Sequence, residues 1–216
     1  MRKIFLSSSG FAPETKKDFL EFIGKDPKTI KIGFIPTASD MEENPTYVQD
    51  DLDSIEEYGM AVAIVDLKNE NAESLYSQLK DVDIILLEGG NTFYLLEWIR
   101  KSGFDTIIGK LLGEGKIYYG ISAGSYVACA TIEATTWKHA DRNFNKLEDL
   151  TGLALVPFLI SAHYNREKYH VAVAGGVSTT KLPVVALLDS QAIIVEDDKY
   201  KVVGTGERNF FNGFKE

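Results

Sequence analysis

Short apolar runs alternate with longer amphipathic stretches through the first two-thirds of the chain. The short runs are rich in β-branched and aromatic residues, which is typical of strands, whereas the longer stretches repeat apolar residues every three or four positions, as helices do. The predicted strands span residues 3–7, 31–36, 61–66, 82–87 and 116–120. The predicted helices span residues 14–23, 45–58, 72–79, 93–99 and 104–112. This alternation predicts an α/β fold in which helices cover both faces of a mostly parallel sheet.

The last third of the chain has a different pattern. Strand-like runs span residues 154–162, 183–188, 191–195 and 201–203, and a helical patch lies near residues 167–174. Two of these runs flank Asp189 and Ser190, which predicts a hairpin and hence antiparallel strands near the C-terminus. The glycine- and threonine-containing stretch 175–180 is predicted to be a loop.

Length, composition and charge narrow the class of protein. A chain of 216 residues, 44% hydrophobic and 25% charged, is typical of one globular domain, which we expect to span residues 1–216. The formal net charge is −9, and no basic run is longer than a pair. Nucleic acid and anionic membranes are therefore poor candidate partners. The sequence carries no signal of an oligomeric state.

Two features bear on where the protein works. The first apolar run, Ile4-Phe5-Leu6, is too short for the core of a signal peptide, and no later run approaches the ~20 residues of a membrane span. Cys129 is the only cysteine, which excludes an internal disulfide and a cysteine-rich metal site. We therefore expect a cytoplasmic protein. We also expect no cofactor.

The segment GISAGS, residues 120–125, has the G-x-S-x-G spacing of a nucleophile elbow. It follows a predicted strand and precedes a small-residue stretch that is able to open a helix, which is the setting that this motif requires. A sharp strand-to-helix turn holds its central residue in strained geometry, and the flanking glycines relieve the crowding. We expect Ser122 to be a nucleophile, and the alternative is a structural Gly-Ser turn.

A serine nucleophile needs backbone N–H groups to bind the oxyanion of the intermediate. Ala123, directly after the serine, supplies one such group. The segment EGGNT at residues 88–92 follows the preceding predicted strand, and its Gly90 is our candidate for the other donor because glycine lets a backbone approach a substrate closely. This segment also has the composition of a simple turn that caps the next helix.

Serine also needs a base, and the chain has three histidines. His139 lies in a polar stretch typical of an exposed loop, and His170 lies on a predicted helix where a solvated face explains it. His163 follows an apolar run and therefore emerges at the end of a predicted strand. Because strand ends carry the sites of such sheets, His163 is the expected base.

The acid that orients the histidine is harder to identify from sequence. Asp189 follows the predicted strand 183–188 and is the first candidate, although an aspartate is also common in a hairpin turn. Asp141 and Glu133 are the other candidates. A further acidic group, Asp50-Asp51-Leu52-Asp53 on a predicted helix, is expected to be a solvated face rather than a metal site.

Three segments are familiar when they are taken together. They are GGNTFYLLEW at residues 89–98, GISAGSYVACATIEATT at residues 120–136 and LISAHY at residues 159–164. In their residues and in their order along the chain, they resemble the motifs of the aspartyl dipeptidase (dipeptidase E) and cyanophycinase-type family of serine peptidases. The resemblance is clearest from residue 83 to residue 163.

The resemblance implies a class I glutamine-amidotransferase-like (flavodoxin-like) α/β fold and a serine peptidase that cleaves short peptides, including dipeptides with an acidic first residue, without a metal. By position, it places the nucleophile on Ser122, the base on His163 and the oxyanion donors on Gly90 and Ala123. The glutamate described as the third triad member falls on Asp189.

This chain departs from the family at three positions. Trp137 stands where dipeptidase E has an aspartate, which favours Asp189 as the acid. Ala162 stands where dipeptidase E typically has proline before the histidine. Arg166 resembles an arginine associated with the acidic substrate side chain, although the loop that precedes it is shorter here.

Two other functions remain open from sequence. An α/β-hydrolase-like esterase also uses G-x-S-x-G, but places its acid between the serine and the histidine. A catalytically inactive family member acting as a binding protein would keep the fold, and Trp137 motivates that reading. Glutamine amidotransferases carry cysteine at the elbow, so Ser122 argues against that activity.

Overall fold

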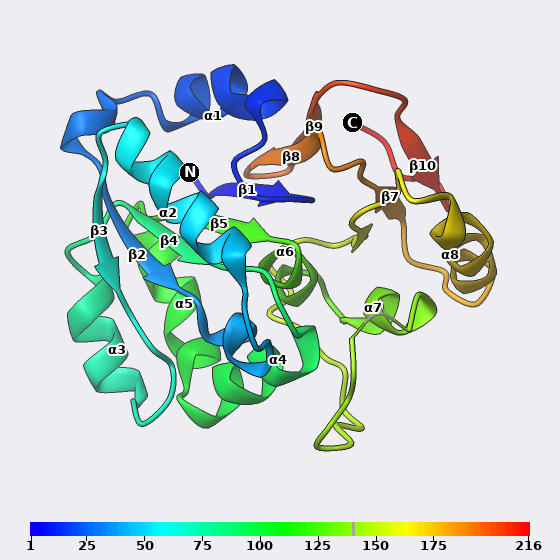
Figure 1. Ribbon diagram of the computed structural model, residues 1–216, viewed down its shortest axis with the longest axis horizontal. Helices are drawn as coiled ribbons and strands as arrows, with labels where there is room; N and C mark the ends of the chain where they lie inside the picture. The colour runs from blue at the N-terminus through cyan, green and yellow to red at the C-terminus, as the bar shows by residue number, and fades with distance from the viewer. Residues whose placement is uncertain (140) are drawn as a thin grey trace.

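The computed structural model describes residues 1–139 and 141–216, and its main feature is a seven-stranded sheet (Figure 1). The strands are β1 (Lys3–Ser7), β2 (Lys31–Ile35), β3 (Ala61–Ile64), β4 (Ile84–Leu87), β5 (Ile117–Ile121), β8 (Gln191–Glu196) and β9 (Lys199–Gly204). Their order is β3-β2-β4-β5-β1-β8-β9, and the first five are parallel. β8 runs antiparallel to β1, and β9 antiparallel to β8. The carboxyl ends of β1, β4 and β5 therefore meet at one edge of the sheet.

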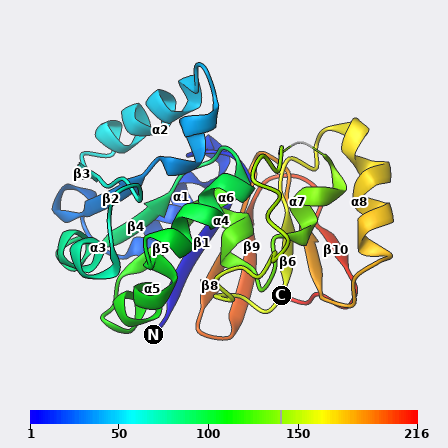
Figure 2. The same ribbon diagram turned by 90° about the horizontal axis from the view of Figure 1, so that it is seen from below.

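Helices cover both faces of this sheet (Figures 1 and 2). They are α1 (Lys16–Ile23), α2 (Thr46–Glu57), α3 (Ala72–Leu79), α4 (Thr92–Lys101), α5 (Phe104–Gly113) and α6 (Ala123–Ala128). Side chains alternate between the two faces of each strand. In β5, for example, Tyr118 packs in the core under α3 to α6, and its neighbour Tyr119 packs in the core under α1 and α2. Each apolar run of the sequence thus serves two cores, which explains why these strands lack a polar face.

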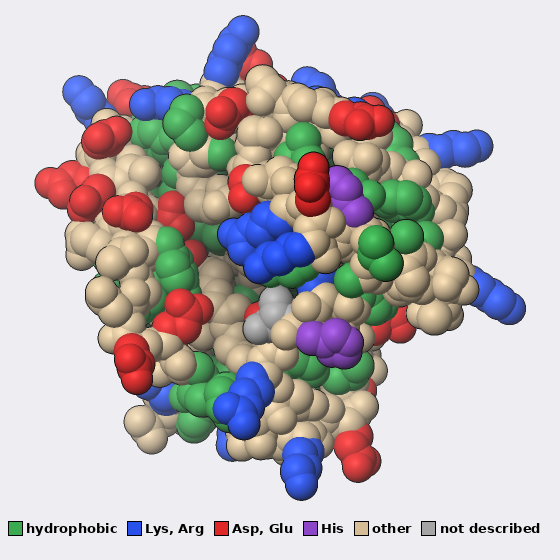
Figure 3. All heavy atoms as spheres, turned by 45° about the vertical axis from the view of Figure 1, so that its right-hand side comes forward, with side chains coloured by type: hydrophobic (Ala, Val, Ile, Leu, Met, Phe, Trp, Pro, Cys, Tyr) green, Lys and Arg blue, Asp and Glu red, His purple; other side chains and the backbone are tan. Residues whose placement is uncertain are grey.

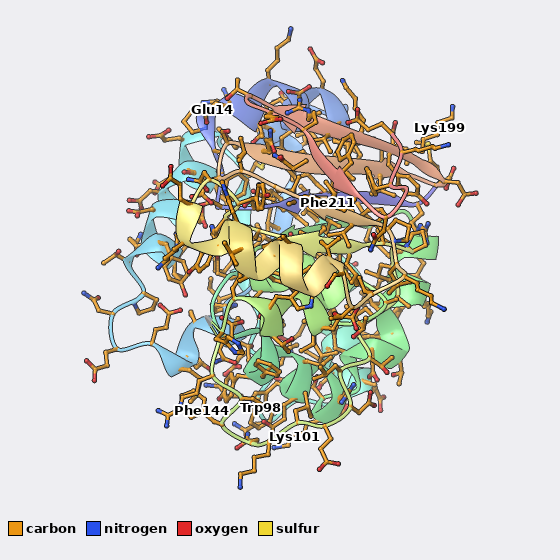
Figure 4. The ribbon with its side chains drawn as sticks, turned by 90° about the vertical axis from the view of Figure 1, so that its right-hand side faces the viewer. Glu14, Trp98, Lys101, Phe144, Lys199 and Phe211 are labelled. Atoms are coloured by element: carbon orange, nitrogen blue, oxygen red, sulfur yellow. The ribbon has the colours of Figure 1, made fainter. Side chains whose placement is uncertain are left out.

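A smaller sheet lies beside the large one. Its strands are β6 (Leu159–Ser161), β7 (Val184–Ala186) and β10 (Asn209–Phe211), in the order β10-β7-β6. β6 and β7 are parallel, and β10 is antiparallel to β7. Two further helices, α7 (Glu133–Trp137) and α8 (His170–Val177), pack on each other in this part of the molecule. Figure 4 looks onto α8, with Phe211 of β10 beside it.

Short 3-10 helices complete the assigned elements. They are η1 (Pro13–Thr15), η2 (Pro27–Thr29), η3 (Thr37–Met41) and η4 (Glu167–Tyr169). In the described part of the chain, no helix combines the length and the apolar character needed to cross a bilayer.

The predicted α/β architecture is confirmed, including antiparallel strands near the C-terminus. The predicted hairpin around Asp189 and Ser190 is wrong, because β7 belongs to the small sheet and β8 to the large one. The hairpin is instead β8–β9.

Two element boundaries also differ from prediction. The strand expected over 154–162 is reduced to β6, since Leu153 and Leu155 donate their N–H groups to the end of α6 before the sheet begins. Gly175 and Gly176, expected in a loop, belong to α8. A Cβ at Gly176 would lie 2.1 Å from Cδ2 of Trp137, so this glycine permits close packing of α8 on α7.

Candidate active site

Ser122 occupies a strained turn between β5 and α6. Its φ of 46° and ψ of −100° lie outside the regions that non-glycine residues normally adopt. The turn is held in place because the N–H of Ser122 donates to the Ser7 carbonyl at the end of β1, 3.0 Å away. The carbonyl of Ser122 accepts the N–H groups of Ser125 and Tyr126 at the start of α6. A strained strand-to-helix turn with serine at its centre is the local structure that the G-x-S-x-G spacing predicts.

The two glycines of the motif have a steric role. A Cβ at Gly120 would lie 2.5 Å from the Gly124 carbonyl oxygen, and a Cβ at Gly124 would lie 2.1 Å from the Leu87 carbonyl oxygen. Real Cβ atoms do not approach backbone oxygens so closely. The G-x-S-x-G spacing is therefore required for α6 to turn back over the ends of β4 and β5.

His163 and Asp189 meet Ser122 at this edge. The Ser122 hydroxyl lies 3.1 Å from Nε2 of His163, and Nδ1 of the same ring lies 2.5 Å from Oδ1 of Asp189. His163 follows β6 and Asp189 follows β7, so both come from the small sheet. The three side chains form a hydrogen-bonded chain of the kind used for nucleophile activation.

The charge of Asp189 suits this arrangement. Burial by itself raises the pKa of Asp189, but the hydrogen bond from His163 and the charges of His163 and Arg166 outweigh it, so the net pKa lies below its ordinary value. Asp189 is therefore a carboxylate at neutral pH, able to accept the Nδ1 proton.

The remaining candidate acids and bases lie elsewhere. His170 is exposed and contacts the Tyr164 carbonyl oxygen at 2.7 Å, and His139 is exposed. Asp141 accepts the N–H of Thr92 and the hydroxyl of Thr135, whereas Glu133 begins α7. In the described residues, Asp189 is the carboxylate that bonds to the His163 ring.

Ser8, which the sequence analysis did not single out, connects the two sheets at the site. Its hydroxyl accepts the His163 N–H at 2.8 Å and lies 3.5 Å from Oδ1 of Asp189. His163 has a positive φ of 59°, so this bond stabilises an unusual backbone conformation. Because Ser8 directly follows β1, its place at the carboxyl end of a parallel strand was the available signal.

The predicted oxyanion donors come from two segments, since Ala123 directly follows Ser122 and Gly90 belongs to the turn after β4. A Cβ placed on Gly89 would lie 3.6 Å from Cβ of Ser122, so the Gly89-Gly90 turn borders the hydroxyl. Gly90 has a φ of 131°, and a Cβ there would lie 2.3 Å from the Ala38 carbonyl oxygen. Among the backbone hydrogen bonds of the described residues, none outside the regular elements uses the N–H of Gly90 or Ala123, and Ala123 is the first residue of α6.

Ser122 and His163 line a cavity of about 540 Å³, and the two ends of this cavity differ in charge. Its acidic end is lined by Glu42, Asp50, Asp51 and Glu88, and its basic end by Lys138 and Arg166, with Asp141 nearby. In Figure 3, Lys and Arg side chains gather beside a hollow, and acidic side chains are more frequent on the left half of the view. The cavity therefore suits a small molecule that carries both charges.

Lys138 was also missed by the sequence analysis. Its Nζ donates at 2.6 Å to both the Tyr126 hydroxyl and the Ala162 carbonyl, and burial lowers its pKa to about 8. The Tyr126 hydroxyl in turn accepts the N–H of Ala162 at 3.0 Å. A proline at position 162 has no N–H, so this contact depends on the departure from the family pattern. The network fixes the backbone directly before His163.

The acidic stretch on α2 is not uniformly solvated as predicted. Asp50 and Asp53 are exposed, but Asp51 is only 5% exposed and its Oδ1 accepts the Phe11 N–H at 3.0 Å. Glu88, fully buried, accepts the Gly89 N–H at 2.6 Å through Oε1. The helix therefore buries one carboxylate of its acidic face, Asp51, and composition alone does not show which one is buried.

Comparison with known proteins places the chain among peptidases. The sequence model described as "Peptidase family S51" matches residues 4–203. An uncharacterized peptidase of Pasteurella multocida is 32% identical over 92% of this chain and 95% of its own length. A peptidase E of Shewanella baltica is 28% identical over 83% of this chain and 76% of its own length.

Solved structures are similar over nearly the whole chain. A candidate peptidase E from Listeria monocytogenes EGD-e superposes with a TM-score of 0.84 and 27% identity, covering 95% of this chain and 100% of that one. A peptidase from an acI-B1 Actinobacterium, at 17% identity and a TM-score of 0.76, shares the fold and covers 99% and 92% of the two chains. The fold implied by the resemblance is thereby confirmed.

Proposed function

The chain belongs to peptidase family S51, and from that premise we propose that it hydrolyses short peptides through Ser122, His163 and Asp189. The observation that carries the proposal is the chain of contacts from the Ser122 hydroxyl to Nε2 of His163 at 3.1 Å and from Nδ1 to Asp189 at 2.5 Å. The order Ser, His, Asp along the sequence also differs from the order of an α/β-hydrolase esterase.

In the first half of the reaction, His163 takes the proton of the Ser122 hydroxyl as the oxygen attacks the scissile carbonyl. Asp189 holds the ring in the tautomer that leaves Nε2 free to accept this proton, and its charge stabilises the imidazolium that forms. The N–H groups of Gly90 and Ala123 bind the carbonyl oxygen as it becomes negative. His163 then protonates the leaving amine, and the acyl group remains on Ser122.

In the second half, water enters the site of the departed amine. His163 removes a proton from the water, which attacks the acyl carbon, and the tetrahedral intermediate again places its negative oxygen between Gly90 and Ala123. Collapse of this intermediate returns the proton from His163 to Ser122 and releases the acid.

The basic end of the cavity indicates which first residue would be preferred. Arg166 and Lys138 line this end, and their combined positive charge favours a carboxylate in the side chain of the residue that donates the acyl group. Arg166 lies with its guanidinium carbon 5.9 Å from the Tyr169 ring centroid, which orients it over the cavity rim. We therefore propose short peptides with an acidic first residue as substrates, and Arg166 as a substrate-binding residue.

A dipeptide library with each of the common first residues tests this function, with release of the free amino acids as the readout. We expect cleavage by the wild type, fastest for aspartyl or glutamyl dipeptides, and none by Ser122→Ala. A fluorophosphonate probe should label Ser122 in the wild type only.

An unlabelled, inactive wild type would contradict the peptidase proposal and favour a catalytically inactive binding protein. Cleavage that ignores the first residue would leave the triad intact but contradict the role of Arg166. Ser9→Ala, a change at a hydroxyl on the cavity rim that is outside the triad, serves as the matched serine control.

A further inference from the structure

Two carboxyl groups at the acidic end of the cavity are buried in contact with each other. Glu88 is fully buried and Asp51 is 5% exposed, and both line the cavity that contains Ser122. Burial and the charge of Asp51 raise the pKa of Glu88 well above its ordinary value, so Glu88 is the member of the pair that carries a proton. The mechanism above assigns neither residue a role.

The polar atoms of this carboxyl pair are only partly satisfied. Oε1 of Glu88 accepts the Gly89 N–H and Oδ1 of Asp51 accepts the Phe11 N–H. Oε2 of Glu88 is buried and has no donor among the described residues. Burial and the neighbouring charge of Asp51 raise the pKa of Glu88 well above its ordinary value, and burial raises that of Asp51 to about 6. An unpaired carboxylate oxygen in the floor of a cavity is a costly feature that a bound cation would relieve.

The sequence position of Glu88 relates this pair to the scissile bond. Glu88 immediately precedes the Gly89-Gly90 turn, which borders the Ser122 hydroxyl. In a peptide, the α-nitrogen of the residue that donates the acyl group is bonded to the carbon next to the scissile carbonyl. A substrate whose carbonyl oxygen meets the Gly90 N–H therefore brings its own α-nitrogen close to this turn and to the carboxyl pair behind it.

We propose that Glu88 and Asp51 form the subsite for the free α-ammonium group of the substrate, so that the enzyme removes the first residue of a peptide rather than cutting within one. The assignment rests on the proposed function of Ser122. An ammonium group is small and carries three N–H donors, one of which would satisfy the unpaired Oε2 of Glu88. The exposed Asp50 and Glu42 add negative charge at the entrance of the same end.

This assignment also explains why such a pair is tolerated beside an oxyanion. Negative charge near the developing oxyanion opposes its formation, whereas an ammonium bound to the pair cancels that charge as catalysis begins. A substrate with a blocked amine would leave the pair without its cation. The structure thus predicts that the free amine contributes to kcat as well as to KM.

The test compares aspartyl p-nitroanilide with its N-acetyl derivative, and alanyl p-nitroanilide with its N-acetyl derivative. In the wild type we expect kcat/KM to be about 100-fold higher with a free amine in each pair. The double variant Asp51→Asn/Glu88→Gln removes the negative charge of the pair and retains an acceptor for the Gly89 N–H. It should lose most of the preference, with the ratio between free and acetylated substrates falling to within about threefold.

Asp53→Asn, an exposed carboxylate on the same helix, is the matched control and should keep the wild-type ratio. The rate at which a fluorophosphonate labels Ser122 reports whether the elbow survives in the double variant. Retention of the wild-type ratio in the double variant overturns the proposal. Equal losses on free and acetylated substrates with slower labelling also overturn it, because the pair would then only support the Gly89-Gly90 turn. If the probe labels the wild type and the wild type cleaves free and acetylated substrates equally well, this subsite alone is overturned. If the wild type is neither labelled nor active, the proposed function is overturned.

Discussion

The large and small sheets contribute to the candidate site in different ways. The large sheet supplies Ser122 and the Gly89-Gly90 turn from neighbouring parallel strands, β5 and β4. The small sheet supplies His163 after β6 and Asp189 after β7, which are also parallel neighbours. Each sheet alone therefore holds half of the candidate site.

The difference between the halves is in how they are held. The serine is fixed by local geometry, since the strained turn and the glycines of one short segment determine its position. The histidine and aspartate are fixed by contacts over long sequence separations, including the bond from His163 to Ser8 at the end of β1. The distances between Ser122, His163 and Asp189 thus depend on how the small sheet packs against the large one, and the following predictions test that dependence.

The largest effect is expected from removing the small-sheet half. His163→Ala should reduce kcat on the order of 10⁵-fold, and Asp189→Asn about 10⁴-fold, because the serine loses its base or the ring loses its tautomer. In both variants the fluorophosphonate probe should also label Ser122 more slowly than in the wild type. Asp141→Asn, a carboxyl of the same cavity that bonds to Thr92 and Thr135, is the comparison. A greater loss of kcat in Asp141→Asn than in Asp189→Asn would show that Asp189 is not the acid that orients His163.

A smaller loss is expected from weakening the link between the sheets. Ser8→Ala leaves the His163 N–H without its acceptor and should lower kcat about 10- to 100-fold, with little change in KM, as the ring loses its alignment. Ser8→Thr keeps the hydroxyl and should recover part of the activity. Full activity in Ser8→Ala would mean that the docking of the small sheet does not depend on this bond.

Packing within the small-sheet region is tested by two adjacent glycines of α8. Gly176→Ala should lower the free energy of unfolding by about 2 kcal/mol, since the new Cβ would meet the Trp137 ring at 2.1 Å. Gly175→Ala has no heavy atom within 4 Å of the new Cβ and should raise it by about 0.5 to 1 kcal/mol, as expected for alanine in a helix. Urea unfolding of both variants measures the contrast, and equal effects would contradict this packing.

The smallest effect is the pH dependence of folding stability. The carboxyls near the large sheet and the carboxyl of the small sheet contribute to it with opposite signs. The raised pKa values of Glu88 and Asp51 mean that the folded protein binds their protons more tightly, so stability falls as the pH rises from 3.8 through about 6. The lowered pKa of Asp189 acts in reverse, and its contribution is lost as the pH falls through its folded value. Relative to wild type, Glu88→Gln should therefore gain on the order of 1 kcal/mol of stability between pH 4 and pH 7. Thermal unfolding across this range measures the gain, and a loss would show that the charged pair is stabilising.

The sequence was most informative where structure is local. The strands and helices of the first two-thirds follow from apolar periodicity, and 72–79 was predicted with the observed bounds of α3. The strained turn at Ser122 was predictable because strand, serine and glycines are consecutive. The predicted hairpin at Asp189 failed because a turn-like Asp-Ser pair looks the same whether the chain reverses within a sheet or crosses to another.

Charged residues show the same division. Asp50, Asp51 and Asp53 are equivalent acidic positions in the sequence, yet only Asp51 is buried beside Glu88. Ser8 follows a predicted strand, but neither for Ser8 nor for Lys138 does the sequence show which residues the side chain meets. Their partners, His163 and Ala162, lie far along the chain.

The sequence by itself determined the α/β class, the strained position of Ser122 and the family resemblance, because each depends on residues that are consecutive or regularly spaced. Only the tertiary structure decided which acid meets His163, which carboxyl of α2 is buried and where the unpaired oxygen of Glu88 lies. Those outcomes depend on burial and on distances between segments brought together by packing. Hydrophobic periodicity specifies which face of an element is buried, but the partner that a polar group meets there is set by the docking of the whole element.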